Sequence, residues 1–138
     1  MGARGPQVIV LDCSYTMAMV LPDKQRPRSL QRVLAARLFA PAIWPVEVAN
    51  ALRNVVRRQR LNEDEIPAVC ARLEACEVEL LGAGDAGVHP RYLAARQHDL
   101  TAYDAAYLDL ALQRRSALAT LDARLAEAAQ RVGVAVLD

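Results

Sequence analysis

A chain of 138 residues that is 54% hydrophobic is long enough to bury a core of its own, and we expect one domain over residues 1–138. Its 17 Lys and Arg residues against 16 Asp and Glu residues leave a net charge of +1, which excludes the global positive field of a non-specific DNA coat. We also expect a cytoplasmic protein without membrane contact, because no apolar run approaches the roughly 18 residues of a membrane span and no signal peptide begins the chain.

The periodicity of apolar residues predicts short strands alternating with amphipathic helices. In chain order, the expected elements are a strand over 7–12, helices over 14–21 and 29–37, a strand over 38–40, helices over 45–59 and 62–76, a strand over 77–81, helices over 91–97 and 101–113, a strand over 117–121, a helix over 123–131 and a strand over 134–137. Asn62 and Glu65 form a capping-box pattern, and the segment 82–90 is rich in turn residues. This alternation predicts an α/β domain with a mainly parallel sheet.

The cysteines and histidines narrow the chemistry. Three widely spaced cysteines without a Cys-x-x-Cys pair predict free thiols rather than a disulfide framework. The only histidines, His89 and His98, fall in regions that we expect to be loops, and they argue against a Cys/His zinc site. Catalysis by a Ser-His-Asp triad would have to use one of these two residues.

Four acidic residues occupy positions from which they can converge. Asp12 and Asp122 each end an expected strand, and ligand sites in open parallel sheets form at the carboxyl ends of strands. Glu47 and Asp104 each fall in the first turn of an expected helix, where the helix dipole tolerates an anion. If these helices begin at the same edge of the sheet, four carboxylates meet there.

Each acid also has an ordinary structural interpretation when it is taken singly. Asp12 can be a residue after a strand, Asp122 a helix N-cap and Glu47 a first-turn acid placed for the dipole. Asp104 can close a capping box opened by Thr101. The functional interpretation therefore depends on the four residues together.

A cluster of four carboxylates repels itself unless a cation neutralises it. Carboxylate oxygens without His or Cys favour Mg²⁺ or Mn²⁺ over zinc or copper. Such an ion, held with water in its remaining positions, suits phosphodiester cleavage because it activates water and neutralises charge on the phosphate.

Four runs of sequence resemble the signature blocks of PIN domains, in the family's order and spacing over nearly the whole chain. They are Val10-Leu-Asp-Cys-Ser14, Pro45-Val-Glu-Val-Ala-Asn50, Leu100-Thr-Ala-Tyr-Asp-Ala-Ala-Tyr-Leu108 and Ala119-Thr-Leu-Asp122. The chain is most similar to VapC-type toxins of prokaryotic toxin–antitoxin pairs. The resemblance implies an α/β/α sandwich around a parallel sheet of about five strands in the order 3-2-1-4-5. It also implies a Mg²⁺- or Mn²⁺-dependent endoribonuclease, a homodimer, and inhibition by a small cognate VapB-type antitoxin.

By position, the resemblance implies that Asp12, Glu47, Asp104 and Asp122 are the catalytic and metal-binding residues. It implies that Ser14, Asn50 and Thr120 are polar neighbours, which hydrogen-bond the carboxylates or the metal-bound waters. Two positions depart from the family. Position 13 is Cys instead of a small residue, and position 124 is Arg where some relatives carry a second acid, so one metal ion and two both stay open.

The arginines after the second acid suggest a surface for RNA. We expect Arg53, Arg57 and Arg60 to share one face of the helix over 45–59, with Arg58 beside the line of Glu47. One interpretation is a rim that binds phosphates near the acids; the other is a solvated helix end whose cations complement the dipole. The apolar helices over 29–38 and 62–76 are candidates for the partner surface.

Two other classes of function fit the sequence less well. A degenerate PIN fold that serves as a binding module without chemistry is disfavoured by the intact set of four acids. A receiver-like phosphoacceptor at Asp12 needs an early acidic pair and a late strand-end Lys, which the sequence lacks.

Overall fold

The computed structural model describes residues 7–82 and 87–138, and within them five short strands form one parallel sheet. The strands are β1 (Val8–Leu11), β2 (Arg37–Pro41), β3 (Glu79–Leu81), β4 (Ala117–Ala119) and β5 (Val136–Leu137). Every adjacent pair is parallel, and the order across the sheet is β3-β2-β1-β4-β5. The predicted α/β class and strand order are confirmed.

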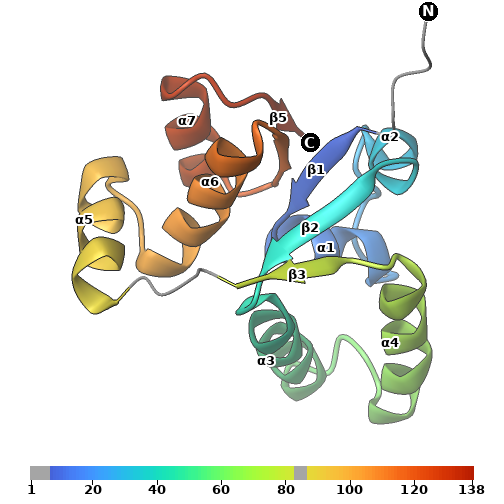
Figure 1. Cartoon of the computed structure of the whole chain (residues 1–138). Coiled ribbons are helices and arrows are strands. Elements are labelled where there is room, and N and C mark those ends of the chain that lie inside the picture. Colours follow the sequence, from blue (N-terminus) through green and yellow to red (C-terminus); the bar gives the residue numbers. More distant parts are fainter. Residues whose placement is uncertain (1–6, 83–86) are drawn as a thin grey trace, which may run out of the picture.

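Helices cover both faces of this sheet (Figure 1). They are α1 (Cys13–Val20), α2 (Leu30–Leu34), α3 (Trp44–Arg57), the 3-10 turn η1 (Glu63–Glu65), α4 (Ile66–Ala75), α5 (Val88–His98), α6 (Ala102–Arg114) and α7 (Ala123–Arg131). α6 and α7 lie on one face with α5 outside α6, and α1 and α4 lie on the other with α3 beside α1. None of the helices in the two described ranges is long and apolar enough to cross a bilayer.

Most element boundaries differ from the sequence prediction by a few residues, and three of these differences have a clear local cause. α2 ends at Leu34, because Arg37 already belongs to β2 and donates its backbone N–H to Gln7 across the sheet. β3 begins only at Glu79, since Glu77 takes a left-handed conformation after α4. α5 begins at Val88, with a proline in its first turn, where a missing N–H costs no helical hydrogen bond. The rest of the predicted turn-rich segment includes residues 83–86, which lie outside the described residues, as do residues 1–6.

The central strands supply the middle of the core. In β1, Ile9, Val10 and Leu11 are fully buried, and β4 is buried throughout, as expected for parallel strands covered on both faces. The buried Trp44 donates its indole N–H to the Thr16 hydroxyl at 3.0 Å, which joins α3 to α1. The core therefore fixes α1 and α3, the two helices that begin after β1 and β2.

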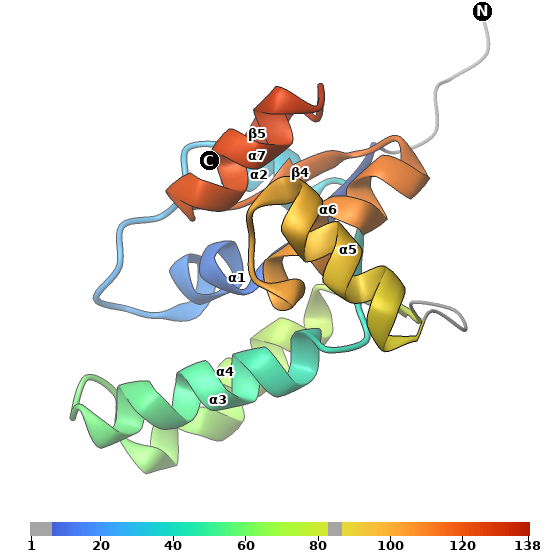
Figure 2. The ribbon, with the colours of Figure 1, turned by 90° about the vertical axis from the view of Figure 1, so that its left-hand side faces the viewer.

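The carboxyl ends of β1 and β4 lie at the same edge of the sheet. The two strands pair in register, with Leu11 opposite Ala119, and each is followed at once by an aspartate that begins a helix. Figure 2 shows the first turns of α1, α3 and α6 close to one another at this edge. The topology thus brings together the elements on which the four predicted acids lie.

Candidate active site

Asp12 is the most buried of the four acids, with 4% of its surface exposed. Its carboxylate accepts the backbone N–H of Tyr15 at 2.8 Å, and so caps α1. It also accepts the hydroxyl of Ser14 at 2.8 Å and that of Thr120 at 2.5 Å. Burial raises the pKa of Asp12 to about 6, against three hydrogen bonds that lower it. Ser14 and Thr120 therefore hold Asp12 in place, as the resemblance predicts.

Asp122 is tied to Asp12 through one hydroxyl. The Asp122 backbone N–H donates to the Thr120 Oγ1 at 3.0 Å, while that hydroxyl donates to Asp12. The Asp122 carboxylate accepts the backbone N–H of Leu125 at 3.0 Å and caps α7. The N-cap interpretation of Asp122 is therefore confirmed, while its role as a site residue stays a prediction.

Glu47 and Asp104 reach the same place from two helices. Glu47 lies in the first turn of α3, half-buried, and its Oε1 accepts the hydroxyl of Tyr107 at 2.5 Å. Asp104 lies in the first turn of α6, where its backbone N–H donates to the capping hydroxyl of Thr101 at 3.1 Å. Burial raises the pKa of Asp104, and the charges of Asp122 and Glu47 raise it further.

The four carboxylates lie near enough to one another for their charges to interact. Asp104 responds to the charges of Asp122 and Glu47, and the charge of Asp104 contributes to the raised pKa of Asp12. Each acid comes from a different segment: the ends of β1 and β4 and the starts of α3 and α6. The structure therefore brings together all four acids that the sequence singled out.

The ligand chemistry of this cluster fits Mg²⁺ or Mn²⁺, since it consists of carboxylate oxygens with hydroxyl neighbours. Across residues 7–82 and 87–138, however, no three His, Cys, Asp or Glu side chains stand close enough to grip an ion as arranged. Like charges repel, and each carboxylate follows its own hydrogen bonds. Glu47, Asp104 and Asp122 are half-buried, so each of them stays partly open to solvent at this edge of the sheet.

Two neighbours of the cluster were not singled out as site residues from sequence. Burial raises the pKa of Cys13 to about 12, and the charges of Glu47, Asp12 and Asp104 add to the rise, so this thiol stays neutral beside the acids. The second neighbour is Tyr107, whose ring is buried in the core. Its position three residues after Asp104 places both on one face of α6, which is the pattern that points to it.

The predicted arginine face is wrong in one member. α3 ends at Arg57, and Gln59 takes a left-handed conformation that turns the chain. Arg60 consequently leaves the helix and pairs with Asp23, with its Nε 2.8 Å from the carboxylate. Arg53, Arg57 and Arg58 are exposed, and Asn50 is exposed one turn after Glu47. Their roles toward a substrate stay predictions.

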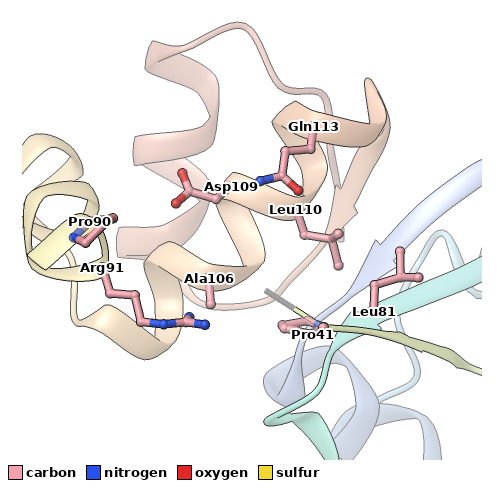
Figure 3. Close-up of a pocket in the computed structure, with 9 residues that line it drawn as sticks. Pro41, Leu81, Pro90, Arg91, Ala106, Asp109, Leu110 and Gln113 are labelled. Atoms are coloured by element: carbon pink, nitrogen blue, oxygen red, sulfur yellow. The ribbon is translucent and has the colours of Figure 1, made fainter. Parts of the chain in front are cut away.

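A cavity of about 230 Å³ lies between the ends of β2 and β3 and helices α5 and α6 (Figure 3). None of the four acids of the cluster lines it. Asp109 lines it. Its carboxylate lies 3.5 Å from the Nε2 of His98, which is buried at the end of α5. Both histidines belong to α5 rather than to loops, and neither approaches the acidic cluster to form a triad.

Comparison with known proteins assigns the chain to a family. The PIN domain model matches residues 9–131. VapC ribonuclease Mb0985 from Mycobacterium bovis is 32% identical over 126 residues, which cover 89% of this chain and 92% of that protein. Ribonuclease VapC3 from Pyrobaculum aerophilum is 31% identical over 121 residues, covering 86% of this chain and 92% of the relative.

A solved structure supports the fold independently. The crystal structure of PAE2754 from Pyrobaculum aerophilum superimposes with a TM-score of 0.71 at 19% identity, covering 94% of this chain and 83% of that one. The sequence match spans all four acidic positions, from the end of β1 to the start of α7. The chain belongs to the PIN domain family, and its relatives within that family are VapC ribonucleases.

Proposed function

We propose that this chain is a Mg²⁺- or Mn²⁺-dependent endoribonuclease that acts in the cytoplasm as the toxin of a toxin–antitoxin pair. One observation carries the proposal: carboxylates from four separate elements converge at one edge of a parallel sheet, where the charges of Glu47 and Asp122 raise the pKa of Asp104. The VapC relatives are ribonucleases, which supports RNA as the substrate.

Asp12, Glu47, Asp104 and Asp122 would hold the cation in this proposal. When bound, the cation supplies an activated water and neutralises charge that develops on the phosphate. Ser14 and Thr120 orient the Asp12 carboxylate, and Thr120 also fixes the backbone of Asp122. Asn50 extends the same face of α3 and is assigned to a metal-bound water or the substrate, since it is exposed one turn after Glu47.

We assign the substrate rim to Arg53, Arg57 and Arg58. All three are exposed on the second half of α3 or at its end, and α3 carries Glu47 in its first turn. Guanidinium groups bind phosphate oxygens in pairs, so such a rim would hold the RNA backbone beside the acids. Sequence preference does not come from these contacts, because phosphates are the same at every nucleotide.

The antitoxin surface in this proposal is the apolar groove between α3, α4 and β3. It has a volume of about 400 Å³, and its walls include Val48 and Leu52 from α3 and Leu73 from α4. Glu74 and Glu77 also line it. An apolar, acid-rimmed groove suits an amphipathic helix that carries basic residues. Purification with a basic-tailed peptide encoded beside this gene would support this partner.

We further propose a homodimer in which α5 takes part. α5 exposes Val88 and Tyr92, with 86% and 60% of their surfaces accessible. They lie one helical turn apart, so they share one face of the helix. Exposed apolar side chains grouped in this way mark interaction surfaces. Analytical ultracentrifugation of the wild type and of Tyr92→Glu tests it: a wild-type monomer would contradict the dimer.

The catalytic proposal is tested with changes that keep the shape of each side chain. Asp12→Asn, Glu47→Gln, Asp104→Asn and Asp122→Asn should each lower Mn²⁺-dependent RNA cleavage at least about 100-fold. Asn is as good an N-cap as Asp, so the helices that Asp12 and Asp122 cap stay formed. Glu127→Gln, an exposed acid on α7, is the matched control and should cleave as the wild type does.

Calorimetry with Mn²⁺ shows whether a variant that no longer cleaves RNA has also lost metal binding. The wild type and Glu127→Gln should bind Mn²⁺ alike, and each of the four site variants should bind it measurably but at least about 10-fold more weakly. Retained cleavage in any two of the four variants would overturn the site. A wild type that binds no Mn²⁺ and cleaves no RNA would favour the binding-module alternative.

A further inference from the structure

The hydroxyl of Tyr107 makes one of the shortest side-chain contacts at the acidic cluster. It donates to Glu47 Oε1 at 2.5 Å and joins α6 to α3 across 60 positions of sequence. The ring of Tyr107 is 1% exposed and belongs to the main apolar core. A ring packed on all sides cannot swing, so its hydroxyl is a fixed point from which Glu47 is held.

Glu47 depends on such an anchor more than the two strand-end acids do. Asp12 and Asp122 have short side chains, and each accepts a backbone N–H at the start of its own helix. Glu47 has one more rotatable bond, so fixing its side chain costs more rotamer entropy. In the described part of the chain, Tyr107 is the hydrogen-bond partner recorded for the Glu47 carboxylate.

We propose that Tyr107 is a positioning residue of the metal centre: its hydroxyl holds Glu47 toward Asp104, so that the helix-borne pair is pre-arranged to receive a divalent cation. The inference rests on the proposed function and deepens it. Asp104 and Tyr107 lie one turn apart on α6, so the same rigid helix fixes one acid directly and the other through the hydroxyl. The contact engages Oε1 of Glu47 and leaves Oε2 as the oxygen for a ligand.

The Tyr107 hydroxyl is a phenol that donates its proton to the Glu47 carboxylate. Phe fills the same core volume without the hydroxyl. Tyr107→Phe consequently removes the donor while leaving the ring packing intact, and it isolates the positioning role.

The experiment is a double-mutant cycle on Mn²⁺ affinity, measured by calorimetry on the whole chain. Tyr107→Phe should weaken Mn²⁺ binding roughly 10-fold or more, the range seen for groups that orient a metal ligand. In the Glu47→Gln background, the same change should add nothing, because the ligand that Tyr107 positions is already gone. A second readout is a slowly exchanging hydroxyl proton in the NMR spectrum of the metal-free protein, which Tyr107→Phe should abolish.

The control is Ser29→Ala, which breaks a comparable hydrogen bond, the one between the hydroxyls of the buried Tyr15 and Ser29 at 2.8 Å. It should lower thermal stability without changing Mn²⁺ affinity. Equal Mn²⁺ affinity in the wild type and Tyr107→Phe, or an equal loss in both backgrounds of the cycle, would overturn the positioning role alone. A wild type that binds no Mn²⁺ would instead overturn the proposed function, and the inference with it.

Discussion

The two acids at strand ends and the two acids on helices are held in different ways. Asp12 and Asp122 each cap the helix that follows, and Thr120 joins them at the sheet edge. Glu47 and Asp104 project from the first turns of α3 and α6, and their positions depend on how those helices pack. The difference teaches that local backbone geometry places one half of the site and tertiary packing places the other.

The largest expected effect concerns the strand-end pair, in the absence of metal. Asp12 has a pKa of about 6 in the folded protein against an ordinary 3.8, so the native state binds more protons than the unfolded chain between these values. The free energy of unfolding therefore falls as pH rises through this window, by about 3 kcal/mol for this group. Asp12→Asn should remove that loss, as measured by urea unfolding in chelator at about pH 4 and about pH 7.

The same measurement on Asp122→Asn separates the two strand-end acids. This variant should keep most of the pH-dependent fall in the free energy of unfolding. If the free energy of unfolding depends on pH equally in the wild type and Asp12→Asn, the Asp12 carboxyl is not the source of the pH dependence.

The next effect tests the hydroxyl that joins the strand-end acids. Thr120→Val removes the donor to Asp12 and the acceptor of the Asp122 N–H, which should cost about 1–3 kcal/mol of stability. Cleavage should fall roughly 10- to 100-fold, since both acids lose orientation. Thr120→Ser keeps the hydroxyl and should restore most of the activity. Failure of Ser to restore it would point to the methyl group rather than to the hydrogen bonds.

A smaller effect is expected at Thr101, the N-cap of the helix α6 that carries Asp104. Thr101→Ala removes the acceptor of the Asp104 N–H and should cost about 1 kcal/mol. Hydrogen exchange should quicken in the first turn of α6 and not at the start of α1. Faster exchange at both places would mean that the two halves of the site are coupled more tightly than their contacts indicate.

The smallest effects are expected at the arginine rim. Arg57→Gln or Arg58→Gln should weaken RNA binding a few-fold and reduce the slope of log affinity against log salt by about 1. Arg60→Gln should change neither, because Arg60 pairs with Asp23 instead of lying on α3. Filter binding at several salt concentrations measures these effects. An equal loss of RNA affinity in all three variants would mean that Arg60 also contacts the RNA.

The sequence predicted what depends on local pattern. Strand β1 and Asp12 followed from a β-branched run that ends in an acid, and the start of α6 followed from Thr101 and its capping pattern. The parallel sheet and its order, which the family resemblance implied, are confirmed. These features succeed because caps, strand ends and apolar periodicity are set by neighbours in sequence.

What the sequence did not predict depends on distant contacts or on unusual backbone. Gln59 adopts a left-handed conformation without glycine to announce it, so the end of α3 and the fate of Arg60 were missed. The pairing of His98 with Asp109 needs α5 packed on α6. The Tyr107–Glu47 contact spans 60 positions, and periodicity shows only that the ring is buried.

The double duty of the strand-end aspartates bears on how such a protein can be silenced by mutation. Because an asparagine still caps α1 or α7, a single-base codon change at Asp12 or Asp122 removes the charge and spares the folded chain. The product would be an inert copy with an unaltered outer surface. Under the proposed function, such a copy would still bind the antitoxin in a cell, so that an inactive allele would lower the amount of antitoxin left for the active toxin.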